Sequence, residues 1–228
     1  MPQEEGHEFL DHEAYHSRWE DQFWGKDGGL QPGQAFDAQR SSPALTDLLQ
    51  RGGLEAAGKR VLVPGCGRGY DLIEFVRAGA AAAVGLELAP SAQREAAAYL
   101  GSTLSAAELG KAEVHTGDFF KWQHPTHPAW DVAYDYTFFC ALHPAMRRDW
   151  AAAYARYLAP GALLACLAFP IVPAGEHPTG PPWPVKPQDY KDVLLPLGFT
   201  LVKEYAVPAE LSHPGRGGKE AMLLFRKD

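Results

Sequence analysis

From about residue 58 onward, short apolar runs alternate with amphipathic segments along the chain. The apolar runs have the length of strands, and the segments between them repeat apolar residues at the spacing of a helix. Seven strands are predicted in this way, at residues 60–64, 82–88, 112–117, 131–138, 162–169, 199–207 and 220–227. Strands that alternate with helices are typical of a mostly parallel sheet with helices on both faces, so we expect an α/β fold.

Two of the intervening helices have clear signals in the sequence. One is predicted at residues 91–101. The other begins near Pro144 and keeps an apolar face as far as Leu158, and Pro160-Gly161 is expected to stop it. The last two strands are separated only by residues 208–218, which predicts an antiparallel hairpin at one end of the sheet.

Two segments lie outside this alternation. Residues 1–57 contain a short predicted helix around residues 13–24, a glycine-rich stretch and a second predicted helix at residues 42–53. Residues 169–187 are a proline-rich loop whose length is typical of functional loops. We expect one domain, in which residues 58–228 form the core and both extra segments cover the carboxyl edge of its sheet, where ligands bind in open α/β folds.

Composition narrows the possible partners. The 228 residues are enough for one large domain with a sizeable core. A formal net charge of −7 and a pI near 5.7 argue against a surface that binds nucleic acid or anionic membranes. The sequence has no apolar run near the ~20 residues of a membrane span and no signal-peptide core, so we expect a soluble, cytoplasmic protein.

The three cysteines, Cys66, Cys140 and Cys166, are far apart and form no C-x-x-C pair. Their number and spacing favour reduced thiols over disulfides, a zinc site or a redox centre. We interpret Cys66 as a small buried side chain rather than a reactive thiol. His12 and His16 have the spacing of a metal-binding pair on a helix, but no third ligand accompanies them, so no metal site is predicted.

The stretch "RVLVPGCGRGYD" at residues 60–71 has the pattern of a buried strand that turns sharply into a helix. Its glycines, Gly65, Gly67 and Gly69, let the backbone approach a ligand and present N–H groups at a helix start. In the dinucleotide fingerprint the third glycine falls where this chain has Tyr70, which disfavours a redox dinucleotide. An amino-acid carboxylate suits the turn better.

Acidic residues stand at the ends of the next three predicted strands. Glu87 ends the second strand, where its carboxylate can accept from both hydroxyls of a ribose. Asp118 ends the third strand and can accept from an adenine amino group, while Phe119 offers a flat apolar contact. Asp135 ends the fourth strand, beside the turn. Together with the absence of a phosphate-binding lysine, these features describe S-adenosylmethionine better than NAD or ATP.

The stretches "VLVPGCGRGYD", "GLEL", "GDFF", "YDYTFFCAL" and "FP" before "GPPW" resemble class I S-adenosylmethionine-dependent methyltransferases. The likeness is to the thiopurine S-methyltransferase family, and within it to the plant and fungal thiol and halide methyltransferase branch. Most class I enzymes carry an acid where this chain has Val63, and "LVPGCG" resembles this family's version. The resemblance covers nearly the whole chain and implies a Rossmann-like core with a helical lid at residues 1–57.

The resemblance also implies a set of cofactor contacts. Trp19 and an aromatic ring at Phe23 or Trp24 would close over the cofactor, and Phe36 stands where that branch has a tryptophan. The remaining implied contacts are Gly65 and Gly67 by the methionine part, Glu87 and Leu88 by the ribose, Asp118 and Phe119 by the adenine, and Asp135 near the methionine amino group. Phe169 matches a position on the acceptor side.

The methyl acceptor is expected to be a thiol, sulfide, thiocyanate or halide. Tyr136, Phe139, Phe169 and Trp183 are predicted to line a polarisable acceptor pocket. An anionic acceptor needs no general base, whereas for a neutral one Asp135 or His143 can take the proton. Two alternatives remain open from the sequence, a nicotinamide-dependent oxidoreductase and a regulatory protein that binds S-adenosylmethionine without catalysis.

Overall fold

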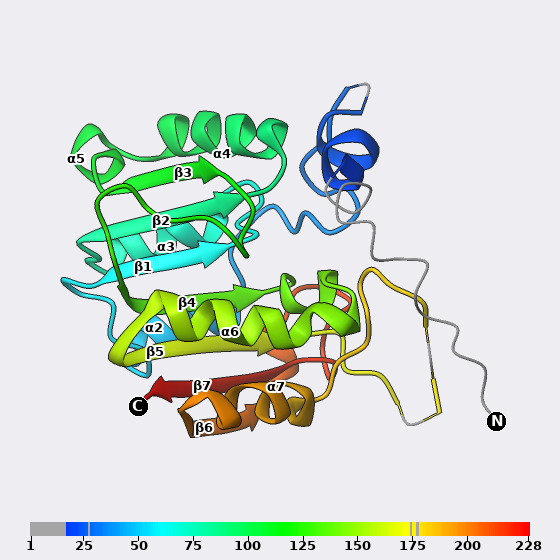
Figure 1. Cartoon of the computed structure of the whole chain (residues 1–228). Helices are drawn as coiled ribbons and strands as arrows, with labels where there is room; N and C mark the ends of the chain where they lie inside the picture. Colours follow the sequence, from blue (N-terminus) through cyan, green and yellow to red (C-terminus); the bar gives the residue numbers. More distant parts are fainter. Residues whose placement is uncertain (1–16, 27, 174, 177) are drawn as a thin grey trace.

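The computed structural model describes residues 17–26, 28–173, 175–176 and 178–228 (Figure 1). In this part of the chain, seven strands form one sheet in the order β3-β2-β1-β4-β5-β7-β6. They are β1 (Arg60–Pro64), β2 (Ala82–Glu87), β3 (Ala112–Thr116), β4 (Trp130–Tyr136), β5 (Leu158–Ala168), β6 (Phe199–Ala206) and β7 (Ala221–Lys227). Neighbouring strands from β3 to β5 are parallel, whereas β7 is antiparallel to both β5 and β6. The predicted α/β fold and the C-terminal hairpin are confirmed.

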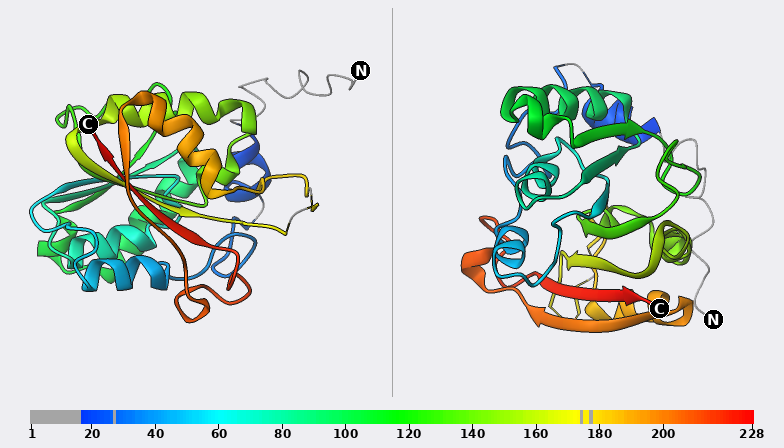
Figure 2. Two further views of the ribbon diagram at one scale, coloured as in Figure 1. Left: turned by 90° about the horizontal axis from the view of Figure 1, so that it is seen from below. Right: turned by 90° about the vertical axis from the view of Figure 1, so that its left-hand side faces the viewer.

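Helices cover both faces of the sheet (Figures 1 and 2). The longer elements are η1 (Trp19–Trp24, a π-helical segment), α2 (Pro43–Gln50), α3 (Tyr70–Arg77), α4 (Pro90–Thr103), α5 (Ala106–Leu109), α6 (Arg147–Tyr157) and α7 (Pro187–Leu194). Short 3-10 turns are η2 (Phe139–Ala141), η3 (Pro144–Met146), η4 (Leu195–Leu197) and η5 (Ala209–Leu211). None of the helices in the described ranges is long and apolar enough to cross a membrane.

Two apolar clusters fix these helices to the sheet. On one face Trp150 of α6 and Tyr190 of α7 pack against β4 and β5. On the other face Leu45 of α2 and Phe75 of α3 pack against β1 and β4. Burial on both sides explains why the inner strands β1 and β2 are nearly continuous apolar runs in the sequence.

The boundary between α6 and β5 differs from the prediction. We expected a helix that reached Leu158 and stopped at Pro160-Gly161, but α6 ends at Tyr157 and β5 starts at the next residue. Leu158 pairs with Trp130 and the pairing resumes between Leu163 and Val132, so β5 advances five residues while β4 advances two. This irregularity accommodates Pro160, which has no N–H to donate to a sheet.

The chain order of the strands creates a crevice. From β1 the chain moves outward through β2 to β3, then returns to β4 on the other side of β1. The connections that leave β1 and β4 therefore diverge at the carboxyl edge, which is where open α/β sheets bind ligands. At the start of the chain, η1 lies within the helix expected around residues 13–24, whereas residues 1–16, and with them His12 and His16, lie outside the described residues.

Candidate active site

A cavity of about 510 Å³ lies at the carboxyl edge of the sheet, beside the crevice between β1 and β4. Its volume is in the range usual for small-molecule sites. The predicted site residues that line it are Trp19, Phe23, Trp24, Phe36, Gly65, Gly67, Glu87, Leu88, Asp118, Phe119, Tyr136 and Phe169. Residues that lie far apart in the sequence thus meet in one place.

The glycine turn (residues 65–69) forms one wall of the cavity. All three glycines have positive φ, at 61° for Gly65, 55° for Gly67 and 81° for Gly69, which other residues rarely adopt. A Cβ on Gly65 would lie 2.7 Å from a ring carbon of Phe138. A Cβ on Gly67 would meet only Trp24, at 3.9 Å, so the missing side chain leaves room for a ligand beside the backbone.

Glu87 is held at the carboxyl end of β2 by the glycine turn. One of its carboxylate oxygens accepts a hydrogen bond from Gly67 N at 2.5 Å. Only 8% of the residue is exposed, and this burial raises its pKa to about 7 against the opposing effect of hydrogen bonds from Gly67 and Leu88. A carboxyl group with such a pKa in a cavity is typical of a ligand site.

Asp118 and Phe119 follow β3, the neighbour of β2, and so lie next to Glu87 along the sheet edge. Asp118 Oδ1 accepts from Phe120 N at 2.9 Å, which orients the carboxylate. The buried ring of Phe119 meets Phe138 edge to face, with 5.0 Å between centroids. Together they offer an acceptor and an apolar ring to a planar group.

Aromatic residues of the lid, defined here as residues 19–26 and 28–42, form another wall. Trp19 stacks on Phe23 at 5.4 Å, and Phe36 lies 5.8 Å from Trp19, 5.5 Å from Phe23 and 6.0 Å from Trp24 between ring centroids. Trp24 is the buried member of the cluster. Both rings left open by the sequence, Phe23 and Trp24, line the cavity.

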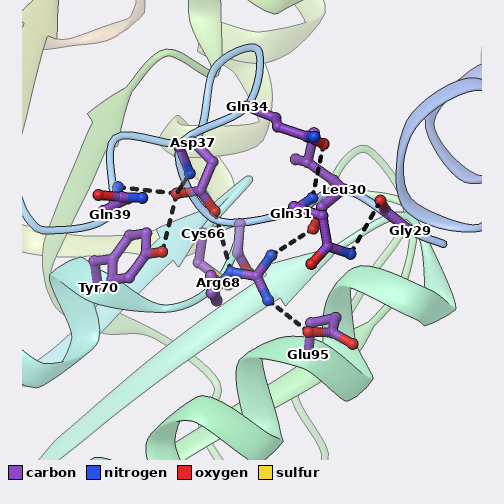
Figure 3. Close-up of polar contacts among 12 residues, drawn as sticks. Gly29, Leu30, Gln31, Gln34, Asp37, Gln39, Cys66, Arg68, Tyr70 and Glu95 are labelled. Atoms are coloured by element: carbon purple, nitrogen blue, oxygen red, sulfur yellow. Dashed lines mark hydrogen bonds and ion pairs between the residues drawn. The ribbon is translucent and has the colours of Figure 1, made fainter.

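Arg68 connects the glycine turn to the lid (Figure 3). Its Nε donates to Asp37 Oδ2 at 3.1 Å, and its Nη2 donates to the carbonyl oxygen of Leu30 at 2.6 Å. Its Nη1 donates to Glu95 of α4 at 2.5 Å. Tyr70 OH adds a 2.9 Å hydrogen bond to Asp37. The Arg68 and Asp37 side chains are only 6% and 2% exposed, so the lid is joined to the turn by a buried ion pair.

Another wall of the cavity combines aromatic rings with a positive charge. Arg216 lies over the rings of Phe169, at 4.6 Å, and Tyr136, at 5.3 Å. It also donates to Tyr136 OH at 2.6 Å, and that hydroxyl donates in turn to Glu220 at 2.6 Å. His213 stacks on Tyr136 with 6.1 Å between centroids. Burial, followed by the nearby arginines, lowers the pKa of His213 to about 4, so this imidazole is neutral near pH 7.

Asp135 does not line the cavity. Its carboxylate, 1% exposed, accepts from Phe139 N at 3.0 Å, from Trp150 Nε1 at 2.8 Å and from Tyr154 OH at 3.2 Å. Burial raises its pKa to about 6. The side chain therefore anchors α6 to β4, which does not fit the expected contact with a methionine amino group or a role as general base.

Phe139, His143 and Trp183 do not line the cavity either. Phe139 is buried against Tyr190, with 4.1 Å between centroids. Trp183 packs edge-on against His143, whose Nδ1 accepts from Ala145 N at 3.2 Å and so caps η3. These side chains support the loop that holds the cavity rather than the cavity itself.

The three cysteines are free thiols and all are buried. Cys66 lies in the glycine turn, and a Cβ on Gly85 of β2 would come within 2.5 Å of its sulfur. Burial raises the pKa of Cys66 well above its usual value. This placement agrees with a small buried filler of the turn.

Sequence reasoning did not select Asp37, Arg68, His213 or Arg216. Each lies on a loop or turn, where no periodicity marks which side chain points inward. One usable signal exists for the last two. Because β6 runs parallel to the central strands, the long connection that follows it, residues 207–220, must start at the same sheet edge as the glycine turn.

Comparison with known proteins identifies the chain. Residues 14–217 match the family described as Thiopurine S-methyltransferase (TPMT). The chain belongs to the thiopurine S-methyltransferase family. As a member of that family it is an S-adenosylmethionine-dependent methyltransferase, which decides against the nicotinamide-dependent alternative and confirms the resemblance seen in the sequence.

Relatives within the family cover most of the chain. Thiocyanate methyltransferase 1 of Brassica oleracea is 33% identical over 227 residues, which is 100% of this chain and 92% of that protein. Probable thiol methyltransferase 2 of Arabidopsis thaliana is 34% identical over 197 residues, with 84% of this chain and 79% of that protein covered.

Solved structures agree on the fold. A TehB-like S-adenosylmethionine-dependent methyltransferase from Corynebacterium glutamicum superimposes with a TM-score of 0.57 at 18% identity, covering 95% of this chain and 97% of that one. Magnesium protoporphyrin IX methyltransferase from Synechocystis PCC 6803, with bound S-adenosylhomocysteine, gives a TM-score of 0.62 at 16% identity, covering 81% and 80%. At these identities the likeness shows the fold alone.

Proposed function

We propose that this methyltransferase moves the methyl group of S-adenosylmethionine to a small soft nucleophile, a thiol or a sulfide-like anion such as thiocyanate, with halides as further candidates. The observation that carries the proposal is the cavity wall in which Arg216 lies over Phe169 and Tyr136, because it is polarisable and positively charged at once. The names of the thiocyanate and thiol methyltransferases among its relatives support the same acceptor class.

The cavity residues fit the cosubstrate. We assign the amino-acid end to the glycine turn, where the missing side chain of Gly67 leaves room for a ligand beside the backbone. Glu87 would accept from the ribose hydroxyls, with Leu88 beside it, and Asp118 would accept from the adenine amino group while Phe119 packs on the ring. The methionine part, the ribose and the adenine are thus assigned to the residues that follow β1, β2 and β3, which are neighbours in the sheet.

S-adenosylmethionine supplies a methyl group on a positively charged sulfur. In the transfer, a lone pair of the acceptor forms the new bond to the methyl carbon, and the electrons of the broken carbon–sulfur bond cancel the charge on that sulfur. The contribution of the protein is to hold the acceptor in line and to keep water out. The aromatic rings of Trp19, Phe36 and Phe169 line the cavity and serve that exclusion.

An anionic acceptor also agrees with the acid–base groups of the site. The two bases considered from the sequence, Asp135 and His143, do not line the cavity. His213 does line it, but its pKa of about 4 makes it a weak base. An acceptor that arrives with its own negative charge needs no proton removed.

The test is a panel of acceptors with the purified protein and S-adenosylmethionine. Hydrosulfide, thiocyanate, iodide, small thiols and a thiopurine are each incubated, and volatile and dissolved methylated products are measured by headspace and liquid chromatography. We expect methylation of the sulfur anions. Cosubstrate binding without any methylated product from the panel would favour the regulatory alternative instead.

We also propose that the protein works in a reducing compartment, such as the cytoplasm. The three buried, unpaired thiols support this assignment, because disulfides are rare in such compartments.

A further inference from the structure

The loop between β6 and β7, residues 207–220, places a cation and a neutral imidazole in the wall of the cavity. Arg216 and His213 both line it, and both contact the Tyr136 ring that ends β4. The inference that this pair holds the methyl acceptor rests on the proposed function, because it assumes that the cavity binds such an acceptor.

The guanidinium of Arg216 contacts neutral groups in the wall of the cavity. Within the described residues, Arg216 forms no ion pair with a carboxylate, although it donates to Tyr136 OH at 2.6 Å and to the carbonyl oxygen of Phe36 at 3.3 Å. The phenol of Tyr136 stands between Arg216 and the buried Glu220. A guanidinium has five N–H groups, so two bonds to neutral oxygens leave donors available to a ligand, and the phenol separates the guanidinium from the Glu220 carboxylate.

His213 carries a polar atom without a partner. The residue is 4% exposed, and its Nδ1 has no hydrogen-bond partner among the described residues. A buried polar atom left in this way costs free energy unless a ligand or water satisfies it. The imidazole lines the cavity while Nδ1 itself is covered, so a ligand in the cavity becomes its partner when the ring turns toward it.

We propose that Arg216 and His213 form a binding subsite for the acceptor anion, in which the guanidinium holds its negative charge and His213 Nδ1–H donates a hydrogen bond to it. The subsite selects small anions over neutral nucleophiles of similar size.

The carboxylate of S-adenosylmethionine is a second anion that such a pair could hold. The position of Arg216 relative to the sheet favours the methyl acceptor as its ligand. The glycine turn follows β1, whereas Phe169, under the guanidinium, follows β5, and two strand spacings separate them by roughly 10 Å. The rings of Tyr136 and Phe169 also make this wall more suitable for a soft anion than for a carboxylate.

The first experiment compares Arg216→Met with the wild type. Steady-state kinetics with thiocyanate at saturating S-adenosylmethionine give KM and kcat, and calorimetric titration gives the Kd of S-adenosylhomocysteine. We expect the KM for thiocyanate to rise at least about tenfold, because a hydrogen-bonded charge is lost. The Kd of S-adenosylhomocysteine should stay within about threefold of the wild type, and Arg216→Lys should recover part of the KM because it keeps the charge.

Arg147→Met is the matched control. Arg147 lies over the ring of Phe139 at 4.7 Å, much as Arg216 lies over Phe169, but it does not line the cavity. Its substitution removes the same charge and should leave the KM for thiocyanate unchanged. Thermal melting of every variant separates lost folding from lost binding.

His213→Phe tests the second member of the subsite. The substitution keeps a ring that can stack on Tyr136 and removes Nδ1. We expect the KM for thiocyanate to rise about fivefold or more, in keeping with one lost hydrogen bond to an anion, with the Kd of S-adenosylhomocysteine unchanged.

The outcomes are distinct. Unchanged KM values in Arg216→Met and His213→Phe overturn the subsite, and a tenfold weaker S-adenosylhomocysteine affinity in Arg216→Met assigns the cation to the cosubstrate instead. A wild type that methylates nothing in the panel overturns the proposed function. In that case calorimetric titration of thiocyanate into the protein with S-adenosylhomocysteine still tests the subsite, because loss of binding in Arg216→Met supports it and equal binding overturns it.

Discussion

Asp37 is the residue on which the attachment of the lid to the glycine turn depends most. Its carboxylate accepts from Gly33 N at 3.3 Å, Gln39 N at 2.9 Å, Tyr70 OH at 2.9 Å and Arg68 Nε at 3.1 Å. The first two bonds shape the lid, and the last two join it to the turn. Asp37→Ala removes all four at once.

The cost is dominated by the charge left behind on Arg68. Removing one partner of a buried ion pair costs ~3–5 kcal/mol. Glu95 keeps its contact with Arg68 and is 54% exposed, so the lower end applies, about 3 kcal/mol of the free energy of unfolding. For a chain of this size that loss lowers the melting temperature by about 6 to 12 °C. The released lid should also weaken the binding of S-adenosylhomocysteine.

The assay is thermal unfolding followed by circular dichroism, with Asp47→Ala as control. Asp47 forms an i,i+4 ion pair with Arg51, whose side chain is 77% exposed, and such pairs contribute about 0.5 kcal/mol. Both variants change the net charge equally. If the melting temperature of Asp37→Ala lies within about 2 °C of that of Asp47→Ala, the buried ion pair between Asp37 and Arg68 does not hold the lid as argued.

Three further changes test the cosubstrate side and the thiols. Because burial holds the pKa of Glu87 near 7 and a ribose needs its ionised form, affinity for S-adenosylhomocysteine should rise with pH from about 6 to about 8. Glu87→Gln should abolish that slope, and an equal slope in both proteins contradicts the assignment. Gly65→Ala should cost ~1–3 kcal/mol more than Gly52→Ala, since both have positive φ but only Gly65 faces Phe138; equal costs in chemical denaturation would argue against that crowding. The three buried thiols should react with a thiol reagent such as DTNB only after unfolding, and rapid labelling of Cys66 in the native protein would show that it is reactive.

The fold was predictable because its signals are local. Buried strands such as β1 appear as continuous apolar runs, and the pattern between them has the helical period. The boundary between α6 and β5 was not predictable, because Pro160-Gly161 fits either a helix stop or an irregular strand. What decides is the pairing of β5 with β4, a contact between segments about thirty residues apart.

In the site, too, some positions could be predicted from local sequence signals and others could not. The sequence placed Glu87 and Asp118 at the sheet edge where the cavity lies, because the ends of parallel strands meet at one edge. The prediction that Asp135 faces the ligand overlooked the alternation of side chains along a strand. Tyr136 lines the cavity, so its neighbour in β4 points to the opposite face, under α6. His213 and Arg216 lie on a loop, where no such rule applies.

Tyr70 shows how a departure from a familiar pattern carries information about function. A third glycine at this position would let helix and strand pack closely around a pyrophosphate. The tyrosine here begins α3 and instead sends its hydroxyl to Asp37, 2.9 Å away in the lid. The position that a dinucleotide fold uses for close packing is thus used to hold a cover over the glycine turn. A reaction that must exclude water from a small anion and a methyl donor gains more from that cover than from a phosphate site.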